Sequence, residues 1–535
     1  MKRFLLVLAF AICSTWAFSQ TKVVKGERPP INLEEVSPDA YEPGKIKIKL
    51  KPGMEKSLPD VKYKALKSGY VVTGVQNIDE LNKQFGATQF TPLLDGIYQK
   101  SAKSSANREK HVAWGFHLWF EIDVNSKANV KEMVKKYSAL EEIEFAEPVY
   151  KKQLIGHVKP VDREEGDTKG SKWTPSDPRY SEQWHYHNTG QQSGTVDKDI
   201  DLPEAWDIEK GNSSVIVAVI DGGIQTNHPD LSGNIWSGVG YNFVNNSSTI
   251  VAHEHGTHVA GTVAAETNNS TGVAGVAGGS GSNDGVRLMS CQVFTSSSSG
   301  GFDQAAIYAA DNGASISQNS WGYTSVNVYD QSTLDAIDYF NANGGGNALN
   351  GGITIFAAGN SDATGNWYPG CYSGTFSVAA TNNKDVRSYY SNYGDWVDIS
   401  APGGEQSYEG DPKGILSTIT NSSYGFMQGT SMACPHVSGV AALLVSNAVR
   451  NGLVLTNTQL RNLLSENVDN HYSVNTSYTG KLGSGRLNAY KALQALQSMF
   501  SNDPPVANFT ASSTSVSEGN TVTFTSTSTG SPTSY

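Results

Sequence analysis

Two runs of largely apolar residues constrain the fold of this chain more than any other feature. Residues 214–220 form a continuous run rich in β-branched side chains, and residues 353–360 form a second run that ends in an amide side chain. A strand that is apolar on both faces is typical of a parallel sheet covered by helices on each side. Asp221 follows the first run, and open α/β sheets bind their ligands at the carboxyl ends of strands. The pattern therefore predicts an α/β domain with a ligand site near Asp221.

Two predicted helices begin at residues that are able to take part in catalysis. Residues 255–265 begin at His255 and are rich in glycine and alanine, which permits close packing. Residues 431–449 begin at Ser431 and carry apolar side chains at core spacing. Pro435 should fall in the first turn of this helix, where its missing N–H costs little. Strands and helices of this kind predict a doubly wound, mostly parallel sheet.

Asp221, His255 and Ser431 supply the three groups that serine-based acyl transfer requires. A serine hydroxyl is a weak nucleophile at neutral pH, so an imidazole must take its proton and a carboxylate must hold that imidazole in the correct tautomer. The motifs around these residues read VIDGG at 219–223, HGTHVAG at 255–261 and GTSMACPH at 429–436. The chain therefore presents the complete catalytic set in the order Asp, His, Ser.

These motifs, in this order, resemble those of the subtilase family of serine proteases, over about residues 173–496. The resemblance implies a subtilisin-like endopeptidase that works through an acyl-enzyme, with proteins or peptides as its substrates. It also implies that Asn360 donates a hydrogen bond to the oxyanion of the reaction. The backbone N–H of Ser431 would be the second donor.

The resemblance further assigns residues that contact the substrate. Ser320, Trp321 and Gly322 should pair with an extended substrate backbone, and Ala357 and Gly359 should belong to one wall of the S1 pocket, which receives the side chain before the cleaved bond. Trp367 stands where subtilisin carries a glycine at the base of this pocket. An indole that points inward would leave room only for small or medium side chains, whereas one that points outward would leave the pocket deep.

A structural calcium ion is another implication of the resemblance. Residues 267–273 interrupt the helix that begins at His255, and they look like the subtilase loop that binds calcium. Carbonyl, amide and carboxylate oxygens together suit this hard cation. The expected ligands are the carboxylates of Asp177 and Asp230, the side chain of Asn269, and the carbonyls of Thr267, Thr271 and Val273.

Two other functions fit parts of the sequence. His253, His255 and His258 form a cluster of the kind that binds hydrolytic zinc. The cluster resembles the metallo-β-lactamase signature, except that Thr257 stands where that family carries an aspartate. A zinc hydrolase would leave two of the three motifs unexplained. A non-catalytic adhesion protein could also keep the fold, and labelling by a fluorophosphonate probe would separate it from an active serine enzyme.

Composition and the N-terminal residues indicate a secreted protein. The net charge of −11 and the lack of a basic run argue against nucleic acid as a partner. Residues 1–19 have the basic start and short apolar core of a signal peptide, and no later apolar run predicts a membrane span. Removing that segment leaves Cys291, Cys371 and Cys434, which allow at most one disulfide within the chain.

Changes of pattern divide the rest of the chain into domains. Residues 20–155 carry strand-like alternations and an amphipathic helix, a small α+β pattern that resembles the inhibitory propeptide of subtilases. Residues 156–172, rich in charge and glycine, look like the linker that maturation cuts. The peptidase domain should cover residues 173–499. Residues 500–535 resemble the first strands of a PKD-type β-sandwich and are too few to close one.

Overall fold

The computed structural model covers most of the chain. It describes residues 23–58, 63–64, 69–94, 105–124, 127–156, 173–500, 509–512, 515–517, 519 and 521–526. The predicted signal peptide lies outside the described residues, as does the predicted linker after Gly156. We call residues 23–150 the N-terminal unit, residues 151–156 the connecting segment and residues 173–500 the main unit.

The N-terminal unit is built on a five-stranded antiparallel sheet with the strand order β2-β3-β4-β1-β5. Its strands are β1 (Tyr41–Leu50), β2 (Tyr63–Lys64), β3 (Gln89–Pro92), β4 (Trp119–Asp123) and β5 (Ile143–Tyr150). Its helices are α1 (Gln76–Phe85), α3 (Ser105–Ala113) and α4 (Val130–Ser138). Ile46 and Ile48 of β1 are completely buried in the core of this unit, as their alternation predicts.

The main unit is built on a nine-stranded sheet with the order β19-β20-β15-β14-β13-β10-β7-β9-β8. Every neighbouring pair is parallel except β19 with β20. These strands are β7 (Ile216–Gly222), β8 (Ile235–Asn242), β9 (Arg287–Phe294), β10 (Ile316–Asn319), β13 (Ile353–Ala357), β14 (Phe376–Thr381), β15 (Ile399–Pro402), β19 (Val468–Asp469) and β20 (Arg486–Leu487).

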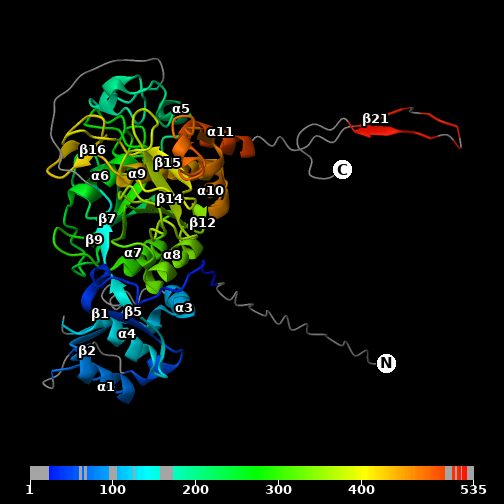
Figure 1. Cartoon of the computed structure of the whole chain (residues 1–535). Helices are drawn as coiled ribbons and strands as arrows, with labels where there is room; N and C mark the ends of the chain where they lie inside the picture. The colour runs from blue at the N-terminus through cyan, green and yellow to red at the C-terminus, as the bar shows by residue number, and fades with distance from the viewer. Residues whose placement is uncertain are drawn as a thin grey trace, which may run out of the picture.

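Helices cover both faces of this sheet. They are α5 (Leu202–Trp206), α6 (Glu254–Ala264), α7 (Phe302–Asp311), α8 (Gln331–Asn343), α9 (Thr430–Arg450), α10 (Asn457–Glu466) and α11 (Ala489–Phe500). Val217 and Val219 of β7 enter the core that contains α6 and α9, whereas Ala218 and Ile220 enter the core that contains α7 and α8. The second core continues into the N-terminal unit, which lies below α7 and α8 in Figure 1. The predicted doubly wound, mostly parallel α/β sheet is therefore confirmed.

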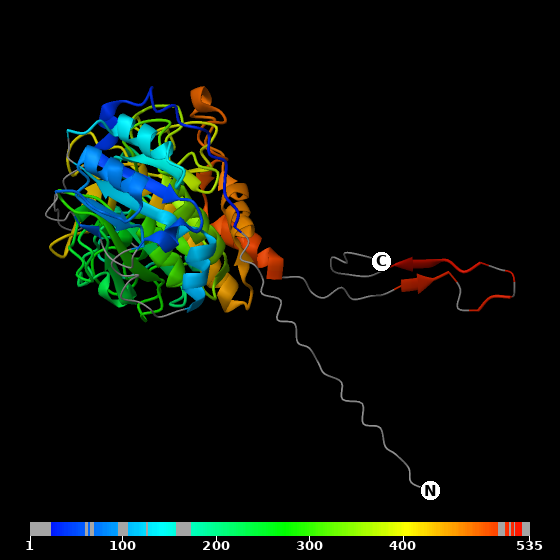
Figure 2. The ribbon, with the colours of Figure 1, turned by 90° about the horizontal axis from the view of Figure 1, so that it is seen from below.

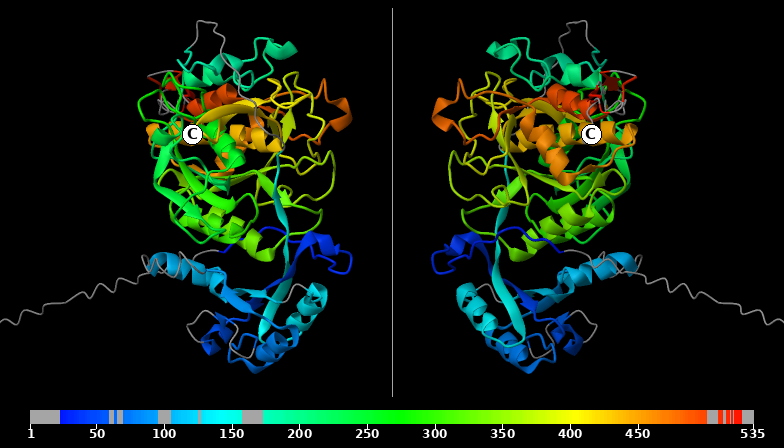
Figure 3. Two further views of the ribbon diagram at one scale, coloured as in Figure 1. Left: turned by 90° about the vertical axis from the view of Figure 1, so that its left-hand side faces the viewer. Right: turned by 90° about the vertical axis from the view of Figure 1, so that its right-hand side faces the viewer.

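Short strands complete the structure. They are β6 (Lys152–Leu154), β11 (Trp321–Tyr323), β12 (Leu349–Asn350), β16 (Ile415–Ile419), β17 (Ser423–Met427), β18 (Leu455–Thr456), β21 (Phe509–Ala511) and β22 (Phe524–Ser526). β21 and β22 pair with each other away from the main unit, as Figure 2 shows, and the PKD-type domain stays a prediction. β5 leads into the connecting segment, which runs up into the main unit (Figure 3).

One local prediction about α9 was wrong. Pro435 is the sixth residue of this helix and lies beyond its first turn. Its missing N–H leaves the carbonyl of Ser431 without the usual helical donor. The hydroxyl of Ser320 takes that place and donates to the Ser431 carbonyl at 3.0 Å. The carbonyl that the proline leaves free thus allows a hydrogen bond between the start of α9 and the residue that follows β10.

α9 also bears on the membrane prediction. Within the described residues, it is the one helix that is long and apolar enough to cross a bilayer by length and composition. Because 94% of its apolar window is buried inside the protein, α9 is a core helix of the main unit. Within the described residues, Cys291, Cys371 and Cys434 are all free thiols.

Candidate active site

Asp221 and His255 meet at the carboxyl edge of the sheet. Asp221 is near the end of β7, and His255 is in the first turn of α6, which starts one residue earlier than predicted. His255 Nδ1 lies 2.8 Å from Asp221 Oδ1, and the carboxylate is completely buried. Asp221 Oδ1 also accepts the N–H of Gly222 at 2.6 Å. Because Nδ1 faces the carboxylate, Nε2 of His255 is left to contact a different group.

Ser431 lies at the start of α9, close to this imidazole. A methyl group built on Gly156 would lie 2.8 Å from His255 Nε2 and 3.6 Å from Ser431 Oγ. The imidazole and the hydroxyl therefore face the same residue of the connecting segment. Ser431 Oγ also lies 3.4 Å from the carbonyl oxygen of Ser320. The fold thus brings the three side chains singled out from the sequence to one place.

Asn360, which follows β13, lies beside the start of α9. Its Oδ1 accepts hydrogen bonds from the backbone N–H and the hydroxyl of Thr430, at 2.9 and 2.8 Å. These two donors fix the amide so that Nδ2 turns the other way. A methyl group built on Gly429 would lie 2.9 Å from Asn360 Nδ2 and 3.5 Å from the carbonyl oxygen of Ile155. The amide nitrogen and that carbonyl therefore face the same gap.

The chain's own connecting segment occupies the edge that the sequence assigned to a substrate. β6 pairs antiparallel with β11, with Leu154 opposite Trp321 and Gln153 opposite Gly322. The N–H of Ile155 continues this ladder by donating to the carbonyl of Ser320 at 2.9 Å. Residues 152–155 thus lie along Ser320 and β11 as an added strand.

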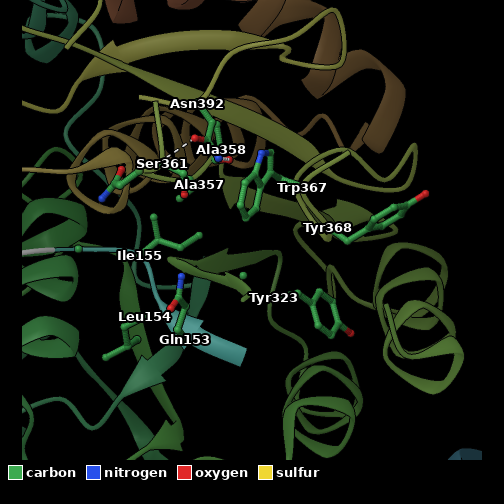
Figure 4. Close-up of a pocket in the computed structure, with 14 residues that line it drawn as sticks. Gln153, Leu154, Ile155, Tyr323, Ala357, Ala358, Ser361, Trp367, Tyr368 and Asn392 are labelled. Atoms are coloured by element: carbon green, nitrogen blue, oxygen red, sulfur yellow. Dashed lines mark hydrogen bonds between the residues drawn. The ribbon is translucent and has the colours of Figure 1, made fainter. Parts of the chain in front are cut away.

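A hollow opens beside Ile155. Its lining includes the predicted residues Ala357, Gly359 and Trp367, and Figure 4 shows Ile155 and Trp367 on opposite sides of it. A methyl group on Gly322 would lie 3.0 Å from Ile155 Cδ1, so the isoleucine packs against the strand edge. The indole of Trp367 is half-buried, and its Nε1 has no hydrogen-bond partner within the described residues. Trp367 therefore borders the space next to the Ile155 side chain.

The residues predicted to bind calcium gather on one side of the main unit. Asp230 Oδ1 accepts from Asn269 Nδ2 at 2.8 Å, and its Oδ2 accepts the N–H of Val273 at 2.9 Å. Asp177 Oδ2 accepts the N–H of Asn268 at 2.6 Å. Burial raises the pKa of Asp177 to about 7 and that of Asp230 to about 8. The site therefore holds two buried acidic side chains close together.

The orientation of Asn269 differs from the one that the sequence suggested. Its amide nitrogen faces Asp230, while its Oδ1 accepts the N–H of Thr271 at 2.8 Å. Thr267 is completely buried in the same loop, and its hydroxyl donates to the carbonyl of Gly275 at 2.9 Å. The predicted ligands are thus neighbours, but the side-chain oxygen of Asn269 is not directed at the carboxylate.

The histidine cluster is divided among separate partners. His258 Nε2 lies 2.8 Å from the carbonyl of Ile415, and burial lowers the pKa of this imidazole to about 3. His253 Nδ1 accepts the N–H of His255 at 3.2 Å and so caps α6. Within the described residues, no three His, Cys, Asp or Glu side chains are arranged to hold a metal. Since His255 is bonded to Asp221, the geometry gives no support to the zinc hypothesis.

Ile155, Gly156 and Thr430 also belong to the site, although the sequence motifs gave no individual role to any of them. Thr430 lies within the serine motif, so its place beside Ser431 could have drawn attention to it. Ile155 and Gly156 stand at the predicted boundary between two domains. No local pattern connects them with the catalytic residues, because their contacts depend on the docking of two distant parts of the chain.

Comparisons with known proteins agree with this geometry. A family model described as the subtilase family matches residues 212–492. A thermophilic serine proteinase of Bacillus sp. (strain AK1) is 34% identical over 378 residues, covering 70% of this chain and 78% of that protein. Thermitase of Thermoactinomyces vulgaris is 38% identical over 327 residues, covering 60% of this chain and 100% of that protein. A solved structure titled as proteases from Pseudoalteromonas arctica PAMC 21717 has a TM-score of 0.50 and 32% identity, covering 61% of this chain and 100% of that one.

Proposed function

This chain belongs to the subtilase family and is a serine endopeptidase, and from that premise we propose that it is secreted as an inactive precursor and matures by cutting itself. The predicted signal peptide supports secretion. Protein and peptide substrates are hydrolysed through an acyl-enzyme on Ser431. The N-terminal unit acts as the inhibitor until it is released.

The roles of the triad follow from its contacts. His255 Nε2 takes the proton of Ser431 as the serine oxygen attacks the substrate carbonyl. The 2.8 Å contact between His255 Nδ1 and Asp221 supports Asp221 as the group that orients the imidazole and stabilises its cationic form. His255 then gives the proton to the leaving amine, and a water molecule repeats the cycle on the acyl-enzyme.

Asn360 Nδ2 and the N–H of Ser431 are the proposed oxyanion donors. The two hydrogen bonds from Thr430 hold the Asn360 amide in place, and donors fixed in advance stabilise developing charge without reorganising. Ser431 lies in the first turn of α9, where helix geometry leaves N–H groups without internal acceptors. The two donors therefore need no rearrangement before the reaction.

The position of the connecting segment, next to His255 and Ser431, is the observation that supports self-processing. The N–H of Ile155 is held by Ser320, and its carbonyl oxygen faces the gap that Asn360 Nδ2 also faces. The next residue, Gly156, packs over His255 and Ser431. A chain bound in this way presents the bond between Ile155 and Gly156 to the serine. We infer that this bond is the first one cut, and that residues 152–155 then remain in the cleft as a bound product.

Two measurements on one preparation test this proposal. The mature chain should begin at Gly156, which mass spectrometry and N-terminal sequencing determine. A fluorophosphonate probe should label Ser431 after the N-terminal unit has left, and much more slowly while that unit fills the cleft. A mature protein that the probe does not label would favour the non-catalytic adhesion hypothesis instead.

The residues around Asp177 and Asp230 fit a structural calcium ion. Two buried carboxylates whose pKa values are raised by desolvation favour the binding of a cation. The carbonyls of Thr267, Thr271 and Val273 would add oxygens of the kind that calcium prefers. Asn269 would join them once its amide turns so that Oδ1, and not Nδ2, faces Asp230. The ion would tie the loop after α6 to the segment around Asp177. Catalysis would not depend on it directly.

A further inference from the structure

Lys152 is the fourth residue before the proposed cut, counting Ile155 as the first, and its side chain enters the main unit. Only 4% of that side chain is exposed, and the Asp330 carboxylate is fully buried. Lys152 Nζ donates a hydrogen bond to Asp330 Oδ2 and lies 4.7 Å from the ring centre of Tyr323 and 5.0 Å from that of Phe302. A lysine is almost never buried this deeply unless it is paired. The main unit therefore holds a built site for a cation.

Asp330 is fixed within the main unit. It is the residue before α8, where the helix dipole favours negative charge. Its backbone N–H donates to the hydroxyl of Tyr323 at 2.9 Å, and the hydroxyl of Thr333 lies 3.4 Å from its Oδ2. Both contacts lie inside the main unit and keep Asp330 in place when the N-terminal unit has left. The N–H of Tyr150, which donates to Asp330 Oδ1 at 3.1 Å, leaves with that unit and frees an acceptor on the carboxylate.

The charged groups around Asp330 come from both sides of the cleft. Lys47 Nζ lies 3.7 Å from Asp330 Oδ2 and 2.6 Å from Asp303 Oδ2. Glu147 contributes a carboxyl group from β5, and burial together with the nearby Asp330 carboxylate raises the pKa of Glu147 well above its ordinary value. In the proposed maturation Lys47 and Glu147 leave with the N-terminal unit, and Lys152 leaves when the connecting segment is released from the cleft. Asp303 and Asp330 then keep their place without either lysine.

We propose that Asp330 makes the mature enzyme select lysine or arginine at the fourth residue before the cleaved bond. The inference rests on the proposed function, because it takes the bond after Ile155 as the one presented to Ser431. A cationic side chain at this position would restore the pairing that Lys152 provides. A neutral one would leave a desolvated carboxylate unpaired, and an acidic one would add repulsion. Charge-assisted hydrogen bonding and the two aromatic rings favour the cation further.

A peptide series with the mature enzyme tests this selection. The peptides are Xaa-Gln-Leu-Ile with a fluorogenic leaving group, where Xaa is lysine, arginine, norleucine or glutamate. Norleucine keeps the carbon chain of lysine without its charge. The value of kcat/KM for lysine should exceed that for norleucine by about tenfold or more, and glutamate should be the slowest. The readout is the ratio for lysine over norleucine, so a general loss of activity cancels.

Three variants identify the residue responsible for the ratio. Asp330→Asn should bring it close to one, and Asp330→Glu should retain a preference for lysine. Asp335→Asn is the matched control, because Asp335 lies further along α8 and pairs with Lys25 at 2.7 Å. A lysine-to-norleucine ratio near one in the wild type, or a tenfold ratio that survives Asp330→Asn, would overturn this inference and leave the proposed function unaffected. A mature enzyme that cleaves none of the peptides and takes up no fluorophosphonate would overturn the proposed function, and this inference with it.

Discussion

Some buried pairs of titratable groups lie wholly inside the main unit, such as Asp221 with His255 at 2.8 Å and Arg486 with Asp385 at 2.6 Å. Other ion pairs join the main unit to the N-terminal unit or to the connecting segment. These border pairs include Lys25 with Asp335, Arg28 with Asp338, Lys47 with Asp303, and Lys152 with Asp330. In all four the cation comes from the N-terminal side and the carboxylate from α7 or from the start and body of α8.

This difference has a consequence for maturation. In the proposed maturation, pairs inside the main unit would persist after the chain is cut, whereas the border pairs would last only while the N-terminal unit stays bound. Ionic contacts at an interface set its specificity and weaken as water and salt reach the separated groups. The N-terminal unit is thus held in the manner of a tight but releasable partner. Its proposed release would leave the carboxylates of Asp303, Asp335 and Asp338 on α7 and α8 without these cations.

The largest expected effect concerns the cut that separates the two regions. Ser431→Ala should lower kcat on the order of a millionfold, because the triad acts as one unit, and the precursor should stay intact. Asn360→Ala should cost about a hundred- to a thousandfold and only slow the processing. Both magnitudes are those known for subtilisin and are carried over by family membership. Electrophoresis of the expressed precursor, with peptide hydrolysis, measures both; normal self-cleavage by Ser431→Ala would contradict the mechanism.

The second prediction tests the border charges directly. Lys47→Met leaves Asp303 buried without its cation, so the cleaved N-terminal unit should bind about a hundredfold more weakly. The time from self-cleavage to full activity should shorten accordingly. Lys49→Met is the matched control on the same strand, because Lys49 pairs with Glu144 inside the N-terminal unit at 2.6 Å. If both variants released the N-terminal unit at the wild-type rate, the ion pair between Lys47 and Asp303 would contribute little to the affinity between the two parts.

The same contrast explains how much could be predicted from the sequence. Asp221 and Ser431 stand at the ends of regular elements whose apolar patterns are local, so the sheet could be predicted. The motifs around these residues, through their resemblance to a known family, then singled out the candidate catalytic residues. Details of one or two residues could not: His253 caps α6 and moves its start to Glu254. The pairing of Lys152 with Asp330 joins residues 178 positions apart. This pair forms only because β6 docks on β11, and no periodic pattern of apolar residues in the sequence predicts that contact.

Calcium removal should act on the main unit alone. Binding to the folded state stabilises it by about 2.7 kcal/mol when calcium is at a hundred times its Kd. Chelation should therefore lower Tm by several degrees, on the order of 5 °C. Because Asp177 and Asp230 both lie in the main unit, the shift in Tm should be similar in the mature enzyme and in the Ser431→Ala precursor.

Calorimetry measures this shift in Tm. Calcium should restore Tm and zinc should not, and Asn269→Ala should reduce the shift that chelation causes. An unchanged melting curve in chelator would remove the calcium claim.

The smallest expected effect concerns the side chain before the cleaved bond, in the space that both regions share. Ile155 occupies that position in the precursor, and Trp367 borders the hollow beside it. An indole there limits the room for a substrate side chain, so alanine or valine should be cleaved faster than phenylalanine. A single methylene changes binding in such a pocket by only about 1–3 kcal/mol, so the preference should be graded.

Peptides that differ only at this position give the order of preference for the mature enzyme. Trp367→Gly should reverse it, because the space vacated by the indole would admit an aromatic ring. Tyr408→Gly serves as the control, since Tyr408 is 64% exposed and lines no part of the hollow. If wild-type enzyme preferred phenylalanine, Trp367 would not limit the pocket. The side chain that the cleft holds in the precursor, Ile155, would then not predict the side chain that the mature enzyme prefers before the cleaved bond.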